Sequence, residues 1–390
     1  MGRYVSAILL AAVLGVGCSS PAARVKHADK AHKKPVKGLL EDAREDAKSG
    51  DYDAADAKYA QLYDEARSFN VLEERIDMLI HGGRATKAVE VSKVYYEANV
   101  SDVKGVGLYT EALIAAGEGS LATGAADEMI AFNAEDASAH DKKGRALLLM
   151  DKDDEAIVEL RRAVNLDKAS AAFHESLGQA LIKAGKVDEA ALEFRAAIKT
   201  GSNDAEAHVL LGAALRAQGE LEEAKRELDR AIELDGRSGK AYFELGLLLN
   251  AQTRQPEAEV ALSKAVQLSP NESRFWYAYG EIFRLSQRDD EALSAYKKAV
   301  DLDPPYGKAM TKYGTMLIKR KRLDEAKVVL TNAVRREPKN AANYLPLGVL
   351  YATLREPGPA IDNYERFLKY ASKTDPDRER VKQAISQLKH

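Results

Sequence analysis

The chain has 390 residues, of which 45% are hydrophobic and 31% are charged, and this length alone suggests two or three domains. The formal net charge is −3 and no long run of lysine and arginine departs from that balance, which argues against a nucleic-acid-binding protein. The only cysteine is Cys18, and this excludes disulfides within the chain, iron–sulfur clusters and cysteine-rich zinc sites.

The first 17 residues have the pattern of an export signal. Arg3 precedes an apolar stretch of about 13 residues, 4–16, which is shorter than the roughly 20 residues that a membrane-spanning helix needs. The stretch ends with small residues, Gly15 and Gly17, directly before Cys18. Residues 1–17 are therefore predicted to be a signal peptide that is removed after export.

The residues around Cys18 resemble the lipobox of bacterial lipoproteins. In that family the signal is cut just before the cysteine and the thiol takes a diacylglycerol, so the resemblance implies a covalent lipid on Cys18. Leu14 lies one place further from the cysteine than the family usually has it. Ser19 follows the cysteine, and by resemblance to the enterobacterial sorting pattern this favours the outer membrane. The alternative is an ordinary secreted protein with an unmodified thiol.

Residues 18–37 are predicted to form a tether between the lipid and the folded part. The segment has almost no apolar residues and therefore cannot form a core. It is either a solvated spacer or a contact with anionic headgroups, where each basic residue contributes about 1 kcal/mol. Its basic residues are Arg24, Lys26, Lys30, Lys33, Lys34 and Lys37.

The remainder of the chain is a repeat of 34 residues. A glycine, an alanine twelve residues later and a second alanine seven residues after that recur in register. Small residues let helices approach closely and large residues at helical spacing fill the gaps, so each repeat is predicted to be two antiparallel helices. The recurring glycines are Gly144, Gly178, Gly212, Gly246, Gly280, Gly314 and Gly348.

The period and the spacing resemble the tetratricopeptide repeat (TPR), whose motif is W-x2-L-G-x2-Y, then A-x3-F-x2-A, then P. The unit that starts at Ser273 matches this motif at Trp276, Tyr279, Gly280, Phe283, Ala292, Tyr296, Ala299 and Pro304. The resemblance implies an all-α TPR solenoid of about ten antiparallel helix pairs in a right-handed superhelix. Fold resemblance says little about function, because this fold carries many unrelated roles.

The repeats predict how the chain is organised after the tether. Residues 38–136 are assigned to three degenerate TPR units, which lack the motif glycine, and residues 137–374 to seven regular units. Residues 375–390 are predicted to be a terminal capping helix, because such a solenoid needs its last apolar face covered. The apolar residues on one face of that helix are Val381, Ala384, Ile385 and Leu388.

No enzyme is expected, because the repeats occupy nearly every residue from about 38 to 371. The chain contains no nucleophile elbow, phosphate loop, HExxH or Rossmann glycine pattern. No cofactor and no small-molecule substrate are predicted, apart from the covalent lipid on Cys18.

Three histidines, His140, His174 and His208, lie 34 residues apart and at first suggest a metal site. The same place in later units holds Tyr242 and Trp276, which are not metal ligands. We therefore interpret it as a packing position and predict no metal.

In the TPR family, first-helix positions 2, 5, 9 and 12 of each unit line a concave groove. Lys240, Arg274 and Lys308 would then form a basic column at position 2, beside exposed aromatic residues at position 5. This combination suits an extended peptide with an acidic or carboxylate element, and the alternative is a solvated charged face. The predicted partner-binding residues are Lys240, Phe243, Arg274, Tyr277, Glu281, Arg284, Lys308 and Thr311.

These features together predict a lipid-anchored scaffold on the outer membrane, facing the periplasm, that binds envelope proteins or peptides through its groove. TPR lipoproteins with this layout include pilotins of type IV pilus secretins and members of gliding-motility complexes, so the resemblance implies a role in assembling a pilus, secretion or motility machine. Pilotins are usually shorter than this chain. The alternative functions are an adaptor that regulates peptidoglycan hydrolases or synthases, and an enzyme.

Overall fold

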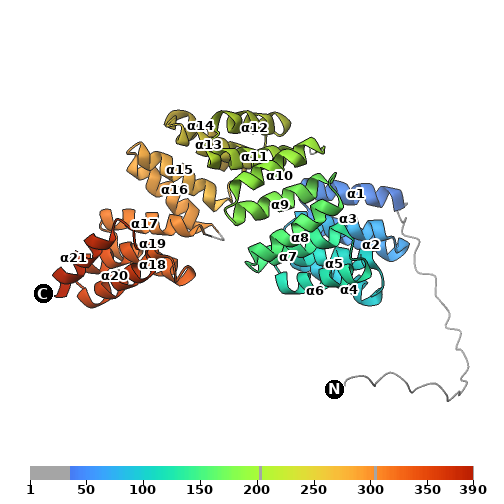
Figure 1. The fold of residues 1–390 in the computed structure, drawn as a ribbon, viewed down its shortest axis with the longest axis horizontal. Helices are drawn as coiled ribbons and strands as arrows, with labels where there is room; N and C mark the ends of the chain where they lie inside the picture. The colour runs from blue at the N-terminus through green and yellow to red at the C-terminus, as the bar shows by residue number, and fades with distance from the viewer. Residues whose placement is uncertain (1–35, 202–203, 303–304, 390) are drawn as a thin grey trace, which may run out of the picture. The chain divides into compact units, whose positions relative to one another are not determined.

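The computed structural model describes residues 36–201, 204–302 and 305–389. In these ranges the chain forms 21 helices and no strand (Figure 1). The predicted all-α fold of ten helix pairs followed by a terminal helix is therefore confirmed. None of these described helices is long and apolar enough to cross a membrane. The predicted lipid site, Cys18, and the predicted tether up to residue 35 lie outside the described residues.

The chain divides into two compact units, Met1–Gly82 and Gly83–His390. The division falls within the segment assigned to degenerate repeats. The described part of the first unit contains the helices α1 (Val36–Ser49), α2 (Tyr52–Ala66) and α3 (Phe69–His81).

The second unit holds the remaining helices, and each of them packs against its neighbours in the chain. They are α4 (Ala85–Ala98), α5 (Val103–Ala115), α6 (Gly119–Phe132), α7 (Ala137–Leu149), α8 (Asp153–Leu166), α9 (Ala171–Lys183), α10 (Val187–Lys199), α11 (Ala205–Gln218), α12 (Leu221–Leu234), α13 (Gly239–Ala251), α14 (Gln255–Leu268), α15 (Ser273–Leu285), α16 (Asp289–Asp301), α17 (Gly307–Lys319), α18 (Leu323–Arg336), α19 (Ala341–Thr353), α20 (Pro357–Tyr370) and α21 (Arg378–Lys389).

The repeat register appears directly in the helix starts. The first helices of the seven regular units begin at Ala137, Ala171, Ala205, Gly239, Ser273, Gly307 and Ala341, which are the residues that open the units in the sequence. The same 34-residue step continues backwards to Val103 and Phe69, the first residues of α5 and α3. The degenerate units therefore keep the period although they lack the motif glycine.

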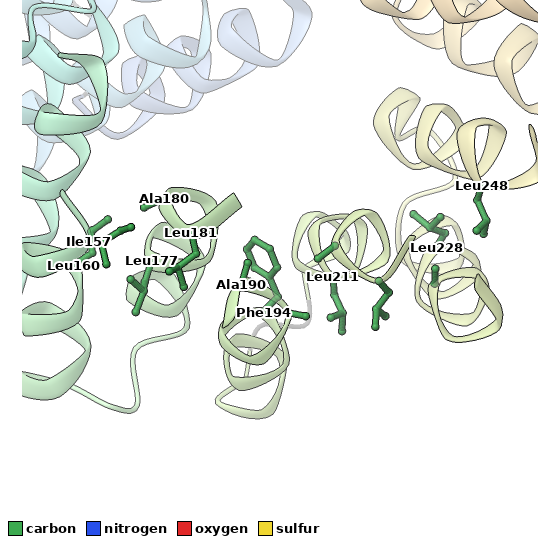
Figure 2. Packing of buried hydrophobic residues seen from close by; sticks show 14 residues of the cluster. Ile157, Leu160, Leu177, Ala180, Leu181, Ala190, Phe194, Leu211, Leu228 and Leu248 are labelled. Carbon is green, nitrogen blue, oxygen red and sulfur yellow. The ribbon is translucent and has the colours of Figure 1, made fainter. Parts of the chain in front are cut away.

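Within each regular unit the motif glycine touches the large residue sixteen positions later. A Cβ atom added at Gly144 would lie 2.5 Å from Leu160, and one added at Gly280 would lie 2.8 Å from the ring of Tyr296. The two helices of a pair can approach this closely only because the glycine has no side chain. Figure 2 shows how buried side chains between α8 and α13 continue from one helix to the next, so the core is a row rather than a single centre.

The turn between the two helices of a unit uses one residue in the left-handed region of backbone conformation. At Gly185 the φ angle is 75°, and at the equivalent Thr253 it is 60°. Glycine adopts this conformation without steric cost, whereas a residue branched at Cβ does not. Other turns carry non-glycine residues at the same place, namely Asp151, Gln287, Lys321 and Arg355.

Helix α21 covers the last apolar surface of the second unit, as predicted for a capping helix. Val381 and Ile385 are buried, and they pack in one cluster with Tyr344 and Phe367 from α19 and α20. The cluster replaces the contacts that a following repeat would otherwise provide.

Candidate partner-binding site

The predicted binding residues lie on α13, α15 and α17, the first helices of three consecutive units (Figure 1). Helix α15 contacts both α13 and α17, so equivalent positions on the three helices are neighbours. We call the surface that these helices share the first-helix face.

The three basic residues of the column are exposed but differ in their partners. The side chain of Lys240 is 65% exposed and donates a hydrogen bond of 2.8 Å to Glu206. Arg274 is 56% exposed and lies 3.9 Å from Glu244, which is too long for a hydrogen bond. Lys308 is exposed and forms no ion pair with the described residues. Their role in binding a partner stays a prediction.

Phe243 differs from the expectation of an exposed aromatic residue, because it is only 3% exposed. Its ring stacks on Phe275 of the neighbouring unit, with ring centres 4.4 Å apart, and the guanidinium of Arg274 lies 4.9 Å from the ring centre. Phe243 therefore packs between two units, and the expectation that it is an exposed aromatic residue of the groove is wrong.

Tyr277, at the same position in the next unit, is half-buried. Its ring contacts Tyr296 and, edge-on at 5.0 Å, Tyr306 from the turn before α17. Burial, together with the nearby Glu281 carboxylate, raises the pKa of Tyr277 to about 12. The hydroxyl therefore stays neutral and can both donate and accept a hydrogen bond at physiological pH.

Glu281 is held in its ionised form inside this surface. Burial alone would raise the pKa of Glu281, but hydrogen bonds from Arg284 and from the hydroxyl of Tyr296 lower it below the usual range. Arg284 donates two of these bonds, at 2.8 and 3.2 Å. The carboxylate is thus already satisfied within the protein, and the same interaction occupies Arg284.

Five of the eight predicted residues line one pocket of about 380 Å³, which we call the α13–α15 pocket. They are Phe243, Arg274, Tyr277, Glu281 and Arg284. The other lining residues are Leu247, Asn250, Leu262, Ala278, Ile282, Leu285 and Tyr306. Lys240, Lys308 and Thr311 do not line it. The structure thus brings together residues from two units that lie up to 41 positions apart in the sequence.

Thr311 has a packing role. Its hydroxyl donates a hydrogen bond of 2.7 Å to the side-chain oxygen of Asn343, which is 1% exposed. The amide of Asn343 in turn donates to the backbone oxygen of Ala333 at 3.1 Å. These bonds link consecutive units rather than preparing Thr311 for a ligand.

Positive charge exceeds negative charge around the pocket. The buried carboxylate of Glu244 accepts a hydrogen bond of 2.9 Å from Arg216, so Arg216 and not Arg274 is its main partner. The first helices α11, α13, α15 and α17 together carry seven basic and three acidic residues, which leaves a surplus of four positive charges. The basic residues are Arg216, Lys240, Arg274, Arg284, Lys308, Lys312 and Lys319, and the acidic residues are Glu206, Glu244 and Glu281.

A second, larger cavity of about 850 Å³ is lined by residues of α13, α14 and α15. Its acidic residues are compensated within the protein, because Glu259 accepts two bonds of 2.8 Å from Arg288 and Glu257 pairs with Arg254. Lys264 also lines the cavity and forms no ion pair with the described residues, so one basic side chain there is left without a compensating acid.

The histidine column serves packing, as interpreted from the sequence. The Nδ1 atom of His174 lies 2.6 Å from Glu193, and its Nε2 atom lies 3.2 Å from the backbone oxygen six residues earlier. Trp276 and Tyr344, at the same position of later units, donate to the backbone oxygen in the same relative place, at 2.8 and 2.6 Å. In the described part of the chain no cluster of three or more histidine or acidic residues could hold a metal ion.

Comparison with family models identifies the repeat. A model described as Tetratricopeptide repeat matches residues 142–205, 175–224 and 209–273, and one described as Cytochrome c-type biogenesis protein H TPR domain matches residues 251–378. The chain contains tetratricopeptide repeats. This fold is a protein-interaction scaffold, and the α13–α15 pocket lies across the junction of the two matched regions.

Solved TPR structures share the fold at low sequence identity. The Cut9–Hcn1 structure of the APC/C hetero-tetramer has a TM-score of 0.58 and 14% identity over 86% of this chain, which spans only 59% of that chain's length. Yeast Tom70 has a TM-score of 0.55 and 14% identity, with 91% of this chain and 95% of Tom70 covered. Human IFIT1 has a TM-score of 0.53 and 15% identity, with 88% and 92% covered. No curated protein sequence matches the chain.

Proposed function

We propose that this TPR protein is a lipid-anchored scaffold of the outer membrane, facing the periplasm, which binds partner proteins and supports assembly of an envelope complex. The observation that carries the binding role is the α13–α15 pocket, where exposed basic and apolar groups from two units converge. The location rests on the export signal and the lipobox around Cys18. The matched family model named for a cytochrome c biogenesis protein is compatible with a role in assembly.

The anchor is tested by Cys18→Ala, with Ser19→Ala as the matched control. We expect metabolic labelling with a palmitate analogue to be lost in the Cys18 variant, and the protein to leave the membrane fraction or accumulate as uncleaved precursor. The Ser19 variant should label like the wild type, because the lipid is attached to atoms of Cys18 and not to the serine hydroxyl. Equal labelling of the two variants would refute the lipid anchor.

The scaffold role is tested by photo-crosslinking in cells. A crosslinking amino acid at Arg274 should capture envelope proteins, while one at Val260, which is 71% exposed and lines the second cavity, should capture fewer. Pilus, secretion or motility components among the captured proteins would support an assembly role. Peptidoglycan hydrolases or synthases would instead identify the protein as a regulator of those enzymes.

A further inference from the structure

We propose that the α13–α15 pocket recognises a peptide segment in which an apolar side chain stands next to a carboxylate. This inference rests on the proposed function, because it assigns a chemistry to the partner of the same face. Two separate observations support it, one for each element of the peptide.

The carboxylate element follows from the state of Arg274. Its guanidinium is 56% exposed, donates no hydrogen bond to the described residues, and is kept over the ring of Phe243 at 4.9 Å. Glu244, the nearest carboxylate, is already bonded by Arg216 at 2.9 Å. Arg274 is therefore a pre-positioned guanidinium with unused donors, which is the geometry that binds a carboxylate through two parallel hydrogen bonds.

The apolar element follows from the floor of the pocket. Leu247 and Leu285 line it with accessible apolar surface, Leu285 being 45% exposed, whereas Ile282 beside them is already buried. A peptide side chain placed there would remove this apolar surface from water, at about 25 cal/mol for each Å² that is buried. The one ionised acid inside, Glu281, is neutralised by Arg284 and therefore does not select a cationic side chain.

The surplus of positive charge on α11, α13, α15 and α17 narrows the class of partner further. A basic segment would meet Arg274 and Lys308 with like charge, which lowers affinity, while an acidic segment is attracted. A phosphate would also be attracted by arginine, but it has no group for the apolar floor. The requirement for both elements is therefore the property that separates peptide recognition from general anion binding.

The test uses the full chain in detergent micelles and three short fluorescein-labelled peptides, read by fluorescence anisotropy. The first probe carries a Glu-Leu-Glu centre between Ser and Gly residues, the second has Lys in place of both Glu, and the third has Ser in place of Leu. We expect the first probe to bind at least about tenfold more tightly than either of the others.

Protein variants locate the binding. Arg274→Gln and Leu285→Ser should each weaken the first probe by about tenfold, because each removes one recognised element. Matched controls are Arg230→Gln on α12, with the arginine 49% exposed, and Leu192→Ser on α10, with the leucine 63% exposed, and both should bind like the wild type. Thermal melting checks that all four variants are folded.

Equal binding of the three probes, or unchanged binding by the Arg274 and Leu285 variants, would overturn the inference. If Arg274 captures envelope proteins in cells while the first probe does not bind, the scaffold function stands and the peptide chemistry is wrong. If the probe binds as expected but the Cys18 variant labels like the wild type, the recognition stands and the anchor does not.

Discussion

Tyr296 and Tyr344 have the largest side chains among the fully buried residues of the second unit, and Gly280 makes room for Tyr296. A Cβ atom at residue 280 would lie only 2.8 Å from the ring of Tyr296, and the hydroxyl of Tyr296 donates a hydrogen bond to Glu281 on the first-helix face. The same tyrosine thus fixes the distance between α15 and α16 and orients a residue of the α13–α15 pocket. Core packing and the candidate site are connected through this one residue.

Gly280→Ala should therefore lower the free energy of unfolding by about 1–3 kcal/mol, because the added methyl group overpacks the contact with Tyr296. The matched control is Gly124→Ala in α6, where an added Cβ meets nothing within 4 Å. The control should stabilise by about 0.5–1 kcal/mol, since alanine is the better helix former. Urea unfolding measures both, and equal effects of the two substitutions would show that the contact carries no strain.

At the scale of the helix pair, a degenerate repeat reverses the sizes of the two contacting side chains: the first helix carries the larger residue and the second helix the smaller one. Thr110 of α5 stands at the position of the motif glycine, and Ala126 of α6 stands sixteen residues later, where regular units have a large residue. Both side chains are completely buried. The volume removed from the second helix is thus supplied by the first, and the pair keeps its spacing without the glycine.

This exchange predicts a non-additive double mutant. Ala126→Leu alone should be destabilising, because the larger side chain overpacks against Thr110. Thr110→Gly alone should also be destabilising, because it leaves a cavity between α5 and α6. The double variant restores the regular pattern, so we expect a favourable coupling of about 1 kcal/mol in a double-mutant cycle. Strict additivity of the two effects, measured by urea unfolding, would mean that the positions do not compensate.

The sequence predicted the helices better than it predicted the site, and there is a physical reason. The 34-residue period determines where helices start, so the starts of α7 to α19 could be read from one repeated position. The burial of Phe243 could not, because it depends on Phe275 in the next unit and not on its own column. Tyr306 was missed because it precedes its helix and lies outside the first-helix positions that were considered. The sequence does show an aromatic residue, Tyr306, directly before α17, and this was the available signal. Its contact with Tyr277 is seen only in the structure.

At the scale of the second unit, the described helices pack chiefly against helices of the same or the adjacent repeat. Helices contact the next helix and the one after it, and ion pairs such as Arg195 to Glu223 at 2.7 Å join consecutive repeats. Stability in such an array is approximately a sum of repeat and interface terms, so damage at one end spreads inwards only gradually. The terminal cap is therefore the place where a local change has the clearest local effect.

Val381→Asp tests this, because it places a charge in the buried cluster beneath α21. We expect amide hydrogen exchange in α19 and α20 to become faster while α13 to α16 keep their protection. The matched control is Gln383→Asp on the exposed side of the same helix, which should leave exchange unchanged. Uniform loss of protection along the second unit would indicate that it unfolds as one cooperative block.

Non-glycine residues in the left-handed turns make the fold less stable than it could be. Thr253 is held at a φ angle of 60° where Gly185 serves in another repeat, and a branched residue there costs about 1–2 kcal/mol. Thr253→Gly should thus raise the melting temperature, with a gain of about 1 kcal/mol after the greater freedom of glycine in the unfolded chain is subtracted, while Gly185→Thr should lower it. Because Thr253 lines neither cavity, heat tolerance in this scaffold can be engineered, or selected by evolution, independently of what it binds.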